Sequence, residues 1–401
     1  MRLELGLCLE GVGECWAAEW CPRGGRGARK SESTGRGKGK GKGRADGDGD
    51  AMELDGAEED DNDASRTTGG DKVGLVAAVF ADGSAAILVV PDPTTVRAAL
   101  GVDDDETAYV KAEPLVRLRV PETGICSVAW GGHEVLAAGC LNGYIAVWRV
   151  GGVLRSGQPP DRPPRPTHYF AAHAALVRQL VFVSTPPPHL AARAAHDLDA
   201  APTGIVSVGY DGSAVLSDLR EPGGGASVLT HERSALYTVA YSAHTGMAYT
   251  LDADDRVKAL GLKPSMQGNE GRVTIHRGAI WSIAASPHHA TVLSASLDGS
   301  AMLSSGVRAL RKRRLRGHYL TRMYRLEVEY RTALDPYNPY SVKGGTAPLE
   351  RSTAAWPAEQ AVTAAAWHPA IACAPLCATG TAIGLGRVDW AEGGQTPAAA
   401  A

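Results

Sequence analysis

The sequence predicts an all-β protein, specifically a β-propeller of six or seven blades. One pattern recurs six times along the chain: a short apolar strand, a strand of small and β-branched residues, a tight turn and a third apolar strand. The turn is often Asp-Gly or Asn-Gly, dipeptides that favour a two-residue hairpin turn with positive φ at both positions. No long helical pattern lies between these strands. Repeats of this kind are typical of propellers.

Three copies of the pattern are clear, and each has an acidic or amide residue before a glycine in its turn. These turns are Asn142-Gly143, Asp211-Gly212 and Asp298-Gly299. Two copies are weaker, at 236–260 and 362–390. A blade needs only its neighbours to bury its faces, so 401 residues are sufficient for one propeller. We expect this domain to span residues 1–390.

The first copy is split by a long insertion. Its opening strand is expected at 15–22, and its other strands at 74–80 and 85–89. The segment 23–72 between them is basic and Gly-rich at first, then acidic, and it has no apolar face. Such a segment buries too little apolar surface to offset the entropy of ordering, so we expect disorder. It is either a solvated loop or a nucleic-acid-binding element masked by its own acidic half.

A second irregular segment spans residues 306–360, which are expected to form a basic loop or a degenerate seventh blade. Glu327 to Tyr330 alternates like a strand. The segment also contains a basic run, which is either a nuclear import signal, a phosphate contact or a solvated loop. Its members are Arg311, Lys312, Arg313, Arg314 and Arg316. Residues 391–401 are expected to form a disordered tail.

Three histidines add a second periodic mark, because each stands four or five residues before an expected opening strand. In WD40 blades a histidine at this place joins a hydrogen-bond network with the turn aspartate. His276 is expected to pair with Asp298, and His231 with Asp252 or Asp254. The predicted structural network comprises His173, Asp211, His231, Asp254, His276 and Asp298. A buried network of this kind must be fully satisfied to be stabilising.

Motifs of catalysis are absent from the sequence. It has no phosphate-binding Gly-rich loop that leads from a strand into a helix, and no Gly-x-Ser-x-Gly nucleophile elbow. Seven cysteines include no Cys-x-x-Cys pair of the kind that binds zinc. We therefore expect no enzyme activity, no metal and no cofactor. No signal peptide and no apolar stretch of membrane-spanning length occur, so an intracellular protein is expected.

Several segments resemble one family. Glu-Cys-Trp at 14–16, Trp-Cys-Pro at 20–22 and Gly-Leu-Val-Ala-Ala-Val-Phe-Ala-Asp-Gly-Ser at 74–84 look like the opening blade of the WD40-repeat β-subunit of general transcription factor IIIC. Further segments are similar to later blades of that family, namely 125–143, 207–220, 284–300 and 365–369. The resemblance covers most of residues 12–390 apart from the insertions.

This resemblance implies a non-catalytic scaffold subunit that supports promoter recognition and transcription by RNA polymerase III in the nucleus. The implied partners are other transcription factor IIIC subunits, including a second propeller. A net charge of −3 indicates that DNA is bound weakly or indirectly. The alternative is a generic WD40 adaptor in chromatin or ubiquitin-ligase assembly. Co-purification with transcription factor IIIC subunits distinguishes the two.

Overall fold

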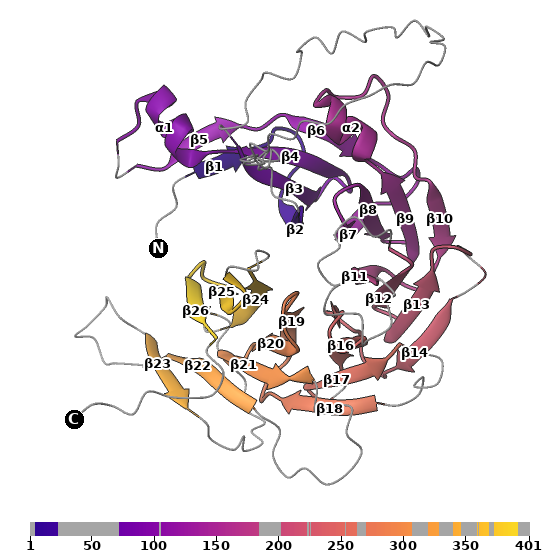
Figure 1. The fold of residues 1–401 in the computed structure, drawn as a ribbon, viewed down its shortest axis with the longest axis vertical. Coiled ribbons are helices and arrows are strands. Elements are labelled where there is room, and N and C mark those ends of the chain that lie inside the picture. Colours follow the sequence, from indigo (N-terminus) through magenta and orange to yellow (C-terminus); the bar gives the residue numbers. More distant parts are fainter. Residues whose placement is uncertain are drawn as a thin grey trace, which may run out of the picture.

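The computed structural model is a six-bladed β-propeller in which six antiparallel sheets follow one another in a ring (Figure 1). The all-β prediction is confirmed, with the lower of the two predicted blade numbers. The structure describes residues 5–22, 72–103, 106–183, 202–222, 224, 226–252, 254–262, 270–306, 320–328, 340–345, 359, 361–368 and 373–391.

The first three blades each have four strands. Blade 1 is β2 (Cys15–Trp20), β3 (Lys72–Phe80), β4 (Ala85–Pro91) and β6 (Pro114–Leu118). Blade 2 is β7 (Ile125–Gly131), β8 (Val135–Cys140), β9 (Tyr144–Arg149) and β10 (His168–Ala171). Blade 3 is β11 (Val177–Val183), β12 (Gly204–Gly209), β13 (Ser213–Asp218) and β14 (Ser227–His231).

The last three blades differ in strand number. Blade 4 is β15 (Ala240–Ser242), β16 (Met247–Leu251), β17 (Arg256–Gly261) and β18 (Glu270–Ile275). Blade 5 is β19 (Ile280–Ala285), β20 (Thr291–Ser296), β21 (Ser300–Ser305), β22 (Leu320–Val328) and β23 (Tyr340–Gly345). Blade 6 is β24 (Val362–Trp367), β25 (Leu376–Thr381) and β26 (Gly386–Trp390).

Four short elements lie outside the blades. β1 (Leu5–Cys8) pairs in parallel with β5 (Ala108–Lys111). Helix α1 (Pro93–Leu100) follows β4, and its N-cap Asp92 accepts a hydrogen bond from the backbone N–H of Thr94. Helix α2 (Gly151–Ser156) follows β9. Neither of these described helices is long and apolar enough to cross a membrane.

The two irregular segments of the sequence are placed by their flanking strands. β2 pairs directly with β3, so the insertion expected at 23–72 lies between two neighbouring strands, and Lys72 already belongs to β3. Within 306–360, β22 and β23 pair onto β21 and extend blade 5. The described part of this segment therefore does not form a blade of its own. The basic run at 311–316 and the tail beyond Ala391 lie outside the described residues.

A β-bulge recurs after the first residue of the inner strand in five of the six blades. The register shifts lie between Cys15/Ala17, Ile125/Ser127, Val177/Gln179, Ile280/Ser282 and Val362/Ala364. A bulge re-aims the side chain of the extra residue. Trp16 and Trp281 occupy this place in blades 1 and 5, and both are exposed.

The turns between the second and third strands correct one prediction. Three residues separate β8 from β9, β12 from β13 and β20 from β21, and in these turns only the glycine has a positive φ. They are therefore three-residue loops that end in a left-handed residue, and not two-residue turns. At Gly212, a Cβ atom would lie 2.3 Å from the backbone oxygen of Glu232, so a side chain is excluded there as well.

The hydrophobic core lies between successive blades. One cluster of buried residues joins blades 1 and 2, a second joins blades 2 and 3, a third joins blades 3, 4 and 5, and a fourth joins blades 5 and 6. Trp148 and Tyr249 are the largest fully buried side chains among the described residues. Burying a large apolar side chain contributes about 1.5–3 kcal/mol, so each blade depends on its neighbours for stability.

Candidate functional site

The turns and the starts of the inner strands lie at one end of the propeller, here called the turn end. The antiparallel register places Val177 opposite Gly209, and Ile280 opposite Ser296, so each inner strand begins beside a turn. Every residue of the predicted network lies at this end. These residues are His173, Asp211, His231, Asp254, His276 and Asp298.

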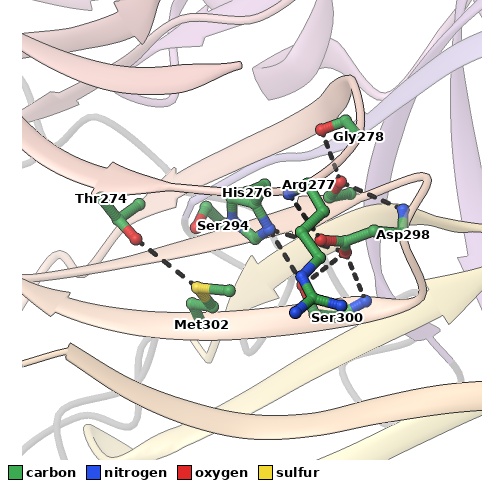
Figure 2. A network of polar contacts seen from close by, with 9 residues as sticks. Thr274, His276, Arg277, Gly278, Ser294, Asp298, Ser300 and Met302 are labelled. Atoms are coloured by element: carbon green, nitrogen blue, oxygen red, sulfur yellow. Dashed lines mark hydrogen bonds and ion pairs between the residues drawn. The ribbon is translucent and has the colours of Figure 1, made fainter. Parts of the chain in front are cut away.

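Blade 5 has the most deeply buried polar network, shown in Figure 2. The ring nitrogens of His276 lie 3.0 Å (Nδ1) from Ser300 Oγ and 2.7 Å (Nε2) from Ser294 Oγ. Asp298 accepts hydrogen bonds from the backbone N–H of Ser300 at 2.9 Å and of Arg277 at 2.8 Å. The hydroxyl of Ser300 also donates to Asp298, so the turn carboxylate is satisfied from several sides.

His276 and Asp298 interact mainly through Ser300. Their closest atoms, Nδ1 and Oδ1, are 3.8 Å apart, which is too far for a hydrogen bond. The Ser300 hydroxyl contacts both residues and bridges them. Burial by itself would raise the pKa of Asp298, but the nearby His276 and the hydrogen bonds outweigh burial and hold this pKa well below its usual range.

Blade 3 has the same arrangement with direct contacts. His173 Nδ1 lies 3.1 and 3.2 Å from the two carboxylate oxygens of Asp211, and Nε2 lies 2.8 Å from Ser207 Oγ. The backbone N–H groups of Ala174 and Ser213 donate to Asp211, each at 2.9 Å. Burial opposes the effect, but these hydrogen bonds and His173 lower the pKa of Asp211. The structure thus brings His173 and Asp211 together.

Blade 4 departs from the predicted network. His231 Nδ1 lies 3.0 Å from Ser213 Oγ in blade 3, and no hydrogen bond of His231 to Asp252 or Asp254 is found in the described structure. Arg256 takes up both carboxylates instead, at 4.0 Å from Asp252 and 2.9 Å from Asp254. The predicted pairing of His231 with either aspartate is therefore wrong.

Glu232, and not His231, occupies the place that histidine holds in blades 3 and 5. In all three cases the backbone N–H of this residue donates to a carbonyl in the turn of the preceding blade. The pairs are His173 with Gly143, Glu232 with Gly212 and His276 with Asp255, at 3.0, 2.8 and 3.0 Å. Glu232 stands four residues before Leu236, the same spacing that His173 and His276 have from their strands. That spacing was the signal that could have identified it.

The side chain of Glu232 completes an ion pair across blades 3 and 4. Lys258 Nζ contacts Glu232 and lies 2.9 Å from Glu270 Oε2. Burial would lower the pKa of Lys258, but the two carboxylates outweigh this effect and raise it. Each network therefore holds one blade through a backbone hydrogen bond and the next through a side chain. Such contacts fix the blades relative to one another.

An exposed aromatic row lies at the turn end of blades 3, 4 and 5. The rings of Tyr210 and Tyr237 meet edge-on with centroids 5.8 Å apart, and Tyr237 stacks on Trp281 at 5.6 Å. Tyr210 and Trp281 are exposed. Each ring comes from a different blade. Aromatic residues are enriched at binding hot spots, since they bury a large area with few rotatable bonds.

A charged hollow of about 560 Å³ opens between blades 3 and 4. Its lining combines acidic and basic side chains, namely His231, Glu232, Arg233, Asp252, Asp254, Arg256, Lys258, Glu270 and Arg272. Most of these charges are paired within the hollow through Lys258 and Arg256. The hollow thus presents a mixed, nearly balanced polar surface beside the aromatic row.

Two buried thiols have raised pKa values, and the described metal-binding side chains form no group of three. Burial raises the pKa of Cys126 to about 11 and of Cys140 to about 12, so both stay protonated at neutral pH. Within the described ranges, no three residues of the His, Cys, Asp and Glu types are grouped to hold a metal ion. The basic run at 311–316 lies outside those ranges, so its role stays a prediction.

No known family model and no curated protein matches the chain. The class of protein is therefore inferred from the fold alone. A six-bladed antiparallel propeller with turn-end His–Asp–Ser networks is compatible with a WD40-type scaffold or interaction adaptor.

Proposed function

We propose that this chain is a non-catalytic scaffold that binds other proteins at the turn end of its propeller. The observation that carries the proposal is the aromatic row of Tyr210, Tyr237 and Trp281, in which Tyr210 and Trp281 are exposed. The row stands on blades that buried networks hold in register, so little flexibility is lost when a partner binds.

The specific proposal is a subunit of transcription factor IIIC, which supports promoter recognition and transcription by RNA polymerase III in the nucleus. Its support is the resemblance of residues 14–22, 74–84 and the later blade segments to the β-subunit of that factor. In this proposal the partners are the other subunits, including a second propeller. The alternative, a generic adaptor in chromatin or ubiquitin-ligase assembly, uses the same surface with different partners.

Pull-down of the tagged chain with mass spectrometry tests both parts. The wild-type chain is expected to recover other transcription factor IIIC subunits, and Tyr210→Ala with Trp281→Ala is expected to lose them while the circular dichroism spectrum stays that of a β protein. The control is Tyr109→Ala, a more exposed aromatic residue on β5 outside the blades. Recovery of unrelated complexes by the wild type would favour the generic adaptor.

DNA binding gives a second, independent test. The purified chain alone is expected to bind a tRNA-gene promoter no better than a random duplex, with affinity that falls steeply as salt is added. The reasons are the net charge of −3 and the absence of a DNA-reading helix from the described structure. Tight and promoter-selective binding by the isolated chain at physiological salt would contradict the scaffold proposal.

A further inference from the structure

The charged hollow between blades 3 and 4 has carboxylates that the chain itself already engages. Lys258 and Arg256 together contact all four carboxylates of the lining, which are Glu232, Asp252, Asp254 and Glu270. Asp252 also accepts hydrogen bonds from the backbone N–H groups of Asp254 and Arg256, at 2.9 and 3.1 Å. The negative charges of the hollow are therefore compensated within the chain.

Two arginines of the lining have no partner of this kind. Arg233 and Arg272 are both exposed, and neither makes a hydrogen bond or an ion pair with any other described residue. The buried Nε of Arg256 also has no hydrogen-bond acceptor among the described residues. A guanidinium presents a planar fork of donors that matches the two oxygens of a carboxylate. The hollow thus has an excess of donors over acceptors.

The position of Arg272 is fixed by the register of blade 4. Arg272 on β18 is the direct cross-strand partner of Lys258 on β17, so their side chains lie on the same face of the sheet. Like charges in this arrangement destabilise a strand pair. The carboxylate of Glu270 already accepts from Lys258 and from Thr230, at 2.9 and 2.7 Å. A further carboxylate at Arg272 would therefore reduce the repulsion between the two cations.

Arg233 lies in the short connection between β14 and the inner strand of blade 4. The backbone of this connection is held on both sides of Arg233, because Glu232 N–H donates to Gly212 and Leu236 N–H donates to Gly209, at 2.8 and 3.1 Å. Such anchoring lowers the entropy lost when a ligand binds the side chain. Arg233 and Arg272 thus come from two different elements and line the same hollow.

The balance of charges favours a carboxylate over a phosphate as the ligand. The lining has four arginine or lysine side chains and four carboxylates, so it is close to neutral when His231 is neutral. A phosphate group carries up to two negative charges and is repelled by nearby acidic side chains. A carboxylate carries a single charge, and each guanidinium can hold one in a bidentate contact.

We propose that the charged hollow binds an acidic peptide segment of another protein, with one Asp or Glu carboxylate at Arg233 and a second at Arg272. Charge complementarity between the two unpaired guanidiniums and the segment supports the proposal. The lining of the hollow contains no aromatic residue other than His231. The inference therefore does not rest on the aromatic row or on the identity of the complex.

Fluorescence anisotropy with the purified full chain tests the proposal. The probe is a rhodamine-labelled hexaglutamate peptide, titrated at physiological salt. Arg233→Gln with Arg272→Gln is expected to weaken its binding about tenfold. The matched control is Arg149→Gln with Arg165→Gln, which removes the same charge at two exposed arginines outside the hollow and is expected to bind like the wild type. Unchanged melting temperatures in both double variants check that the fold is kept.

A second pair of variants separates the fork geometry from charge alone. Arg233→Lys with Arg272→Lys keeps both charges but loses the planar fork, so its affinity is expected to lie between those of the wild type and the glutamine variant. A chain that carries Tyr210→Ala with Trp281→Ala is expected to keep full binding of hexaglutamate. This last result separates the hollow from the turn-end function.

Five outcomes would overturn the proposal. No binding by the wild type, an equal loss in the matched control, or full affinity in the lysine variant would show that the hollow does not recognise carboxylates. Much tighter binding of a phosphoserine hexapeptide would replace the carboxylate by a phosphate. Binding that appears only when the ten carboxylates at 46–63 are changed to amides would assign the hollow to the chain's own acidic segment, and not to a partner.

Discussion

Blades 4 and 5 use different interactions to hold the carboxylates in the turn between their second and third strands. In blade 5, Asp298 is 1% exposed and is held by Ser300, Arg277 and, through Ser300, His276. In blade 4, the turn is four residues long, and Asp254 is 64% exposed beside Arg256. The turn of blade 5 is therefore a buried, hydrogen-bonded network, whereas that of blade 4 is a partly solvated ion pair.

The residue that adopts a positive φ at the end of the turn also differs between the two blades. Five blades have glycine there, while blade 4 has Asp255 with φ 57°. Burial, and the nearby Asp252, Asp298 and Asp254, raise the pKa of Asp255 against the effect of His276. A single repeat can thus depart from the pattern at its turn because ion pairs replace the buried network. Blade stability at this end therefore depends on satisfied carboxylates more than on any one residue type.

The largest effect is expected for Asp298→Ala. Removing the carboxylate leaves the N–H groups of Arg277 and Ser300 without their buried acceptor, which costs about 1–3 kcal/mol. The melting temperature, measured by differential scanning calorimetry, is expected to fall. The control is Asp254→Ala, an exposed ion pair worth about 0–1 kcal/mol. An equal loss in both variants would contradict the difference drawn between the two blades.

The pH dependence of stability should show the same difference. The pKa values of Asp298 and Asp211 lie below their usual range, so both carboxylates bind protons more readily in the unfolded chain. Their contribution is present above the unfolded pKa and is lost as the pH falls through the folded pKa. Urea unfolding measured from neutral to acidic pH is expected to show stability decreasing below about pH 4. The decrease should be smaller in Asp298→Ala, and an unchanged slope would count against the network.

A moderate effect is expected for Glu232→Gln in blade 4. The substitution keeps the size of the side chain but removes one of the two charges that surround Lys258. Since the backbone N–H of residue 232 still donates to Gly212 and the glutamine oxygen can still accept from Lys258, only the charge of the side-chain contact is lost, at a cost of about 1 kcal/mol. Chemical denaturation measures the change. His231→Gln is the neighbouring control, and a larger loss there would restore the pairing that the sequence suggested.

The smallest effect, and the only stabilising one, is expected for Asp255→Asn. Asparagine tolerates the left-handed conformation as aspartate does, and it removes a charge that lies near three other carboxylates. The gain is about 0.5 kcal/mol at neutral pH. Because the pKa of Asp255 is raised, the gain should disappear as acid protonates the wild-type side chain. Thermal unfolding at neutral and acidic pH checks both statements, and a loss of stability at neutral pH would contradict them.

The sequence predicted the blades because several turns repeat a local signal, as in Asp211-Gly212 and Asp298-Gly299. It also indicated His173 and His276, whose spacing from the next strand is local. It did not identify Ser207 and Ser294, because these serines contact histidine across the sheet and look like any strand residue. The sequence also led to the wrong choice of His231 in blade 4. Glu232 has the spacing that His173 and His276 have, but a glutamate was not the expected residue type.

Blade number and the exposure of some apolar strand residues could not be predicted for a different reason. The strand-like alternation from Glu327 to Tyr330 indicates a strand but not its pairing partner, and the structure pairs β22, which ends at Val328, with β21 of blade 5. Likewise, Trp20 and Trp390 look like core residues in the sequence, since an apolar strand reads the same whether or not a neighbouring sheet covers it. Whether blades touch is a property of the whole ring.

The direct pairing of β2 with β3 bears on the order in which the chain folds. Fifty-one residues, 21–71, separate these partners, whereas three-residue loops join β8 to β9 and β12 to β13. Closing the longer connection costs roughly 2.5 kcal/mol more in chain entropy than closing a loop of three residues. Hairpins with short loops form early, so blades 2 and 3 are expected to assemble before β2 docks. The strand synthesised near the start of the chain would thus be among the last to reach its native position.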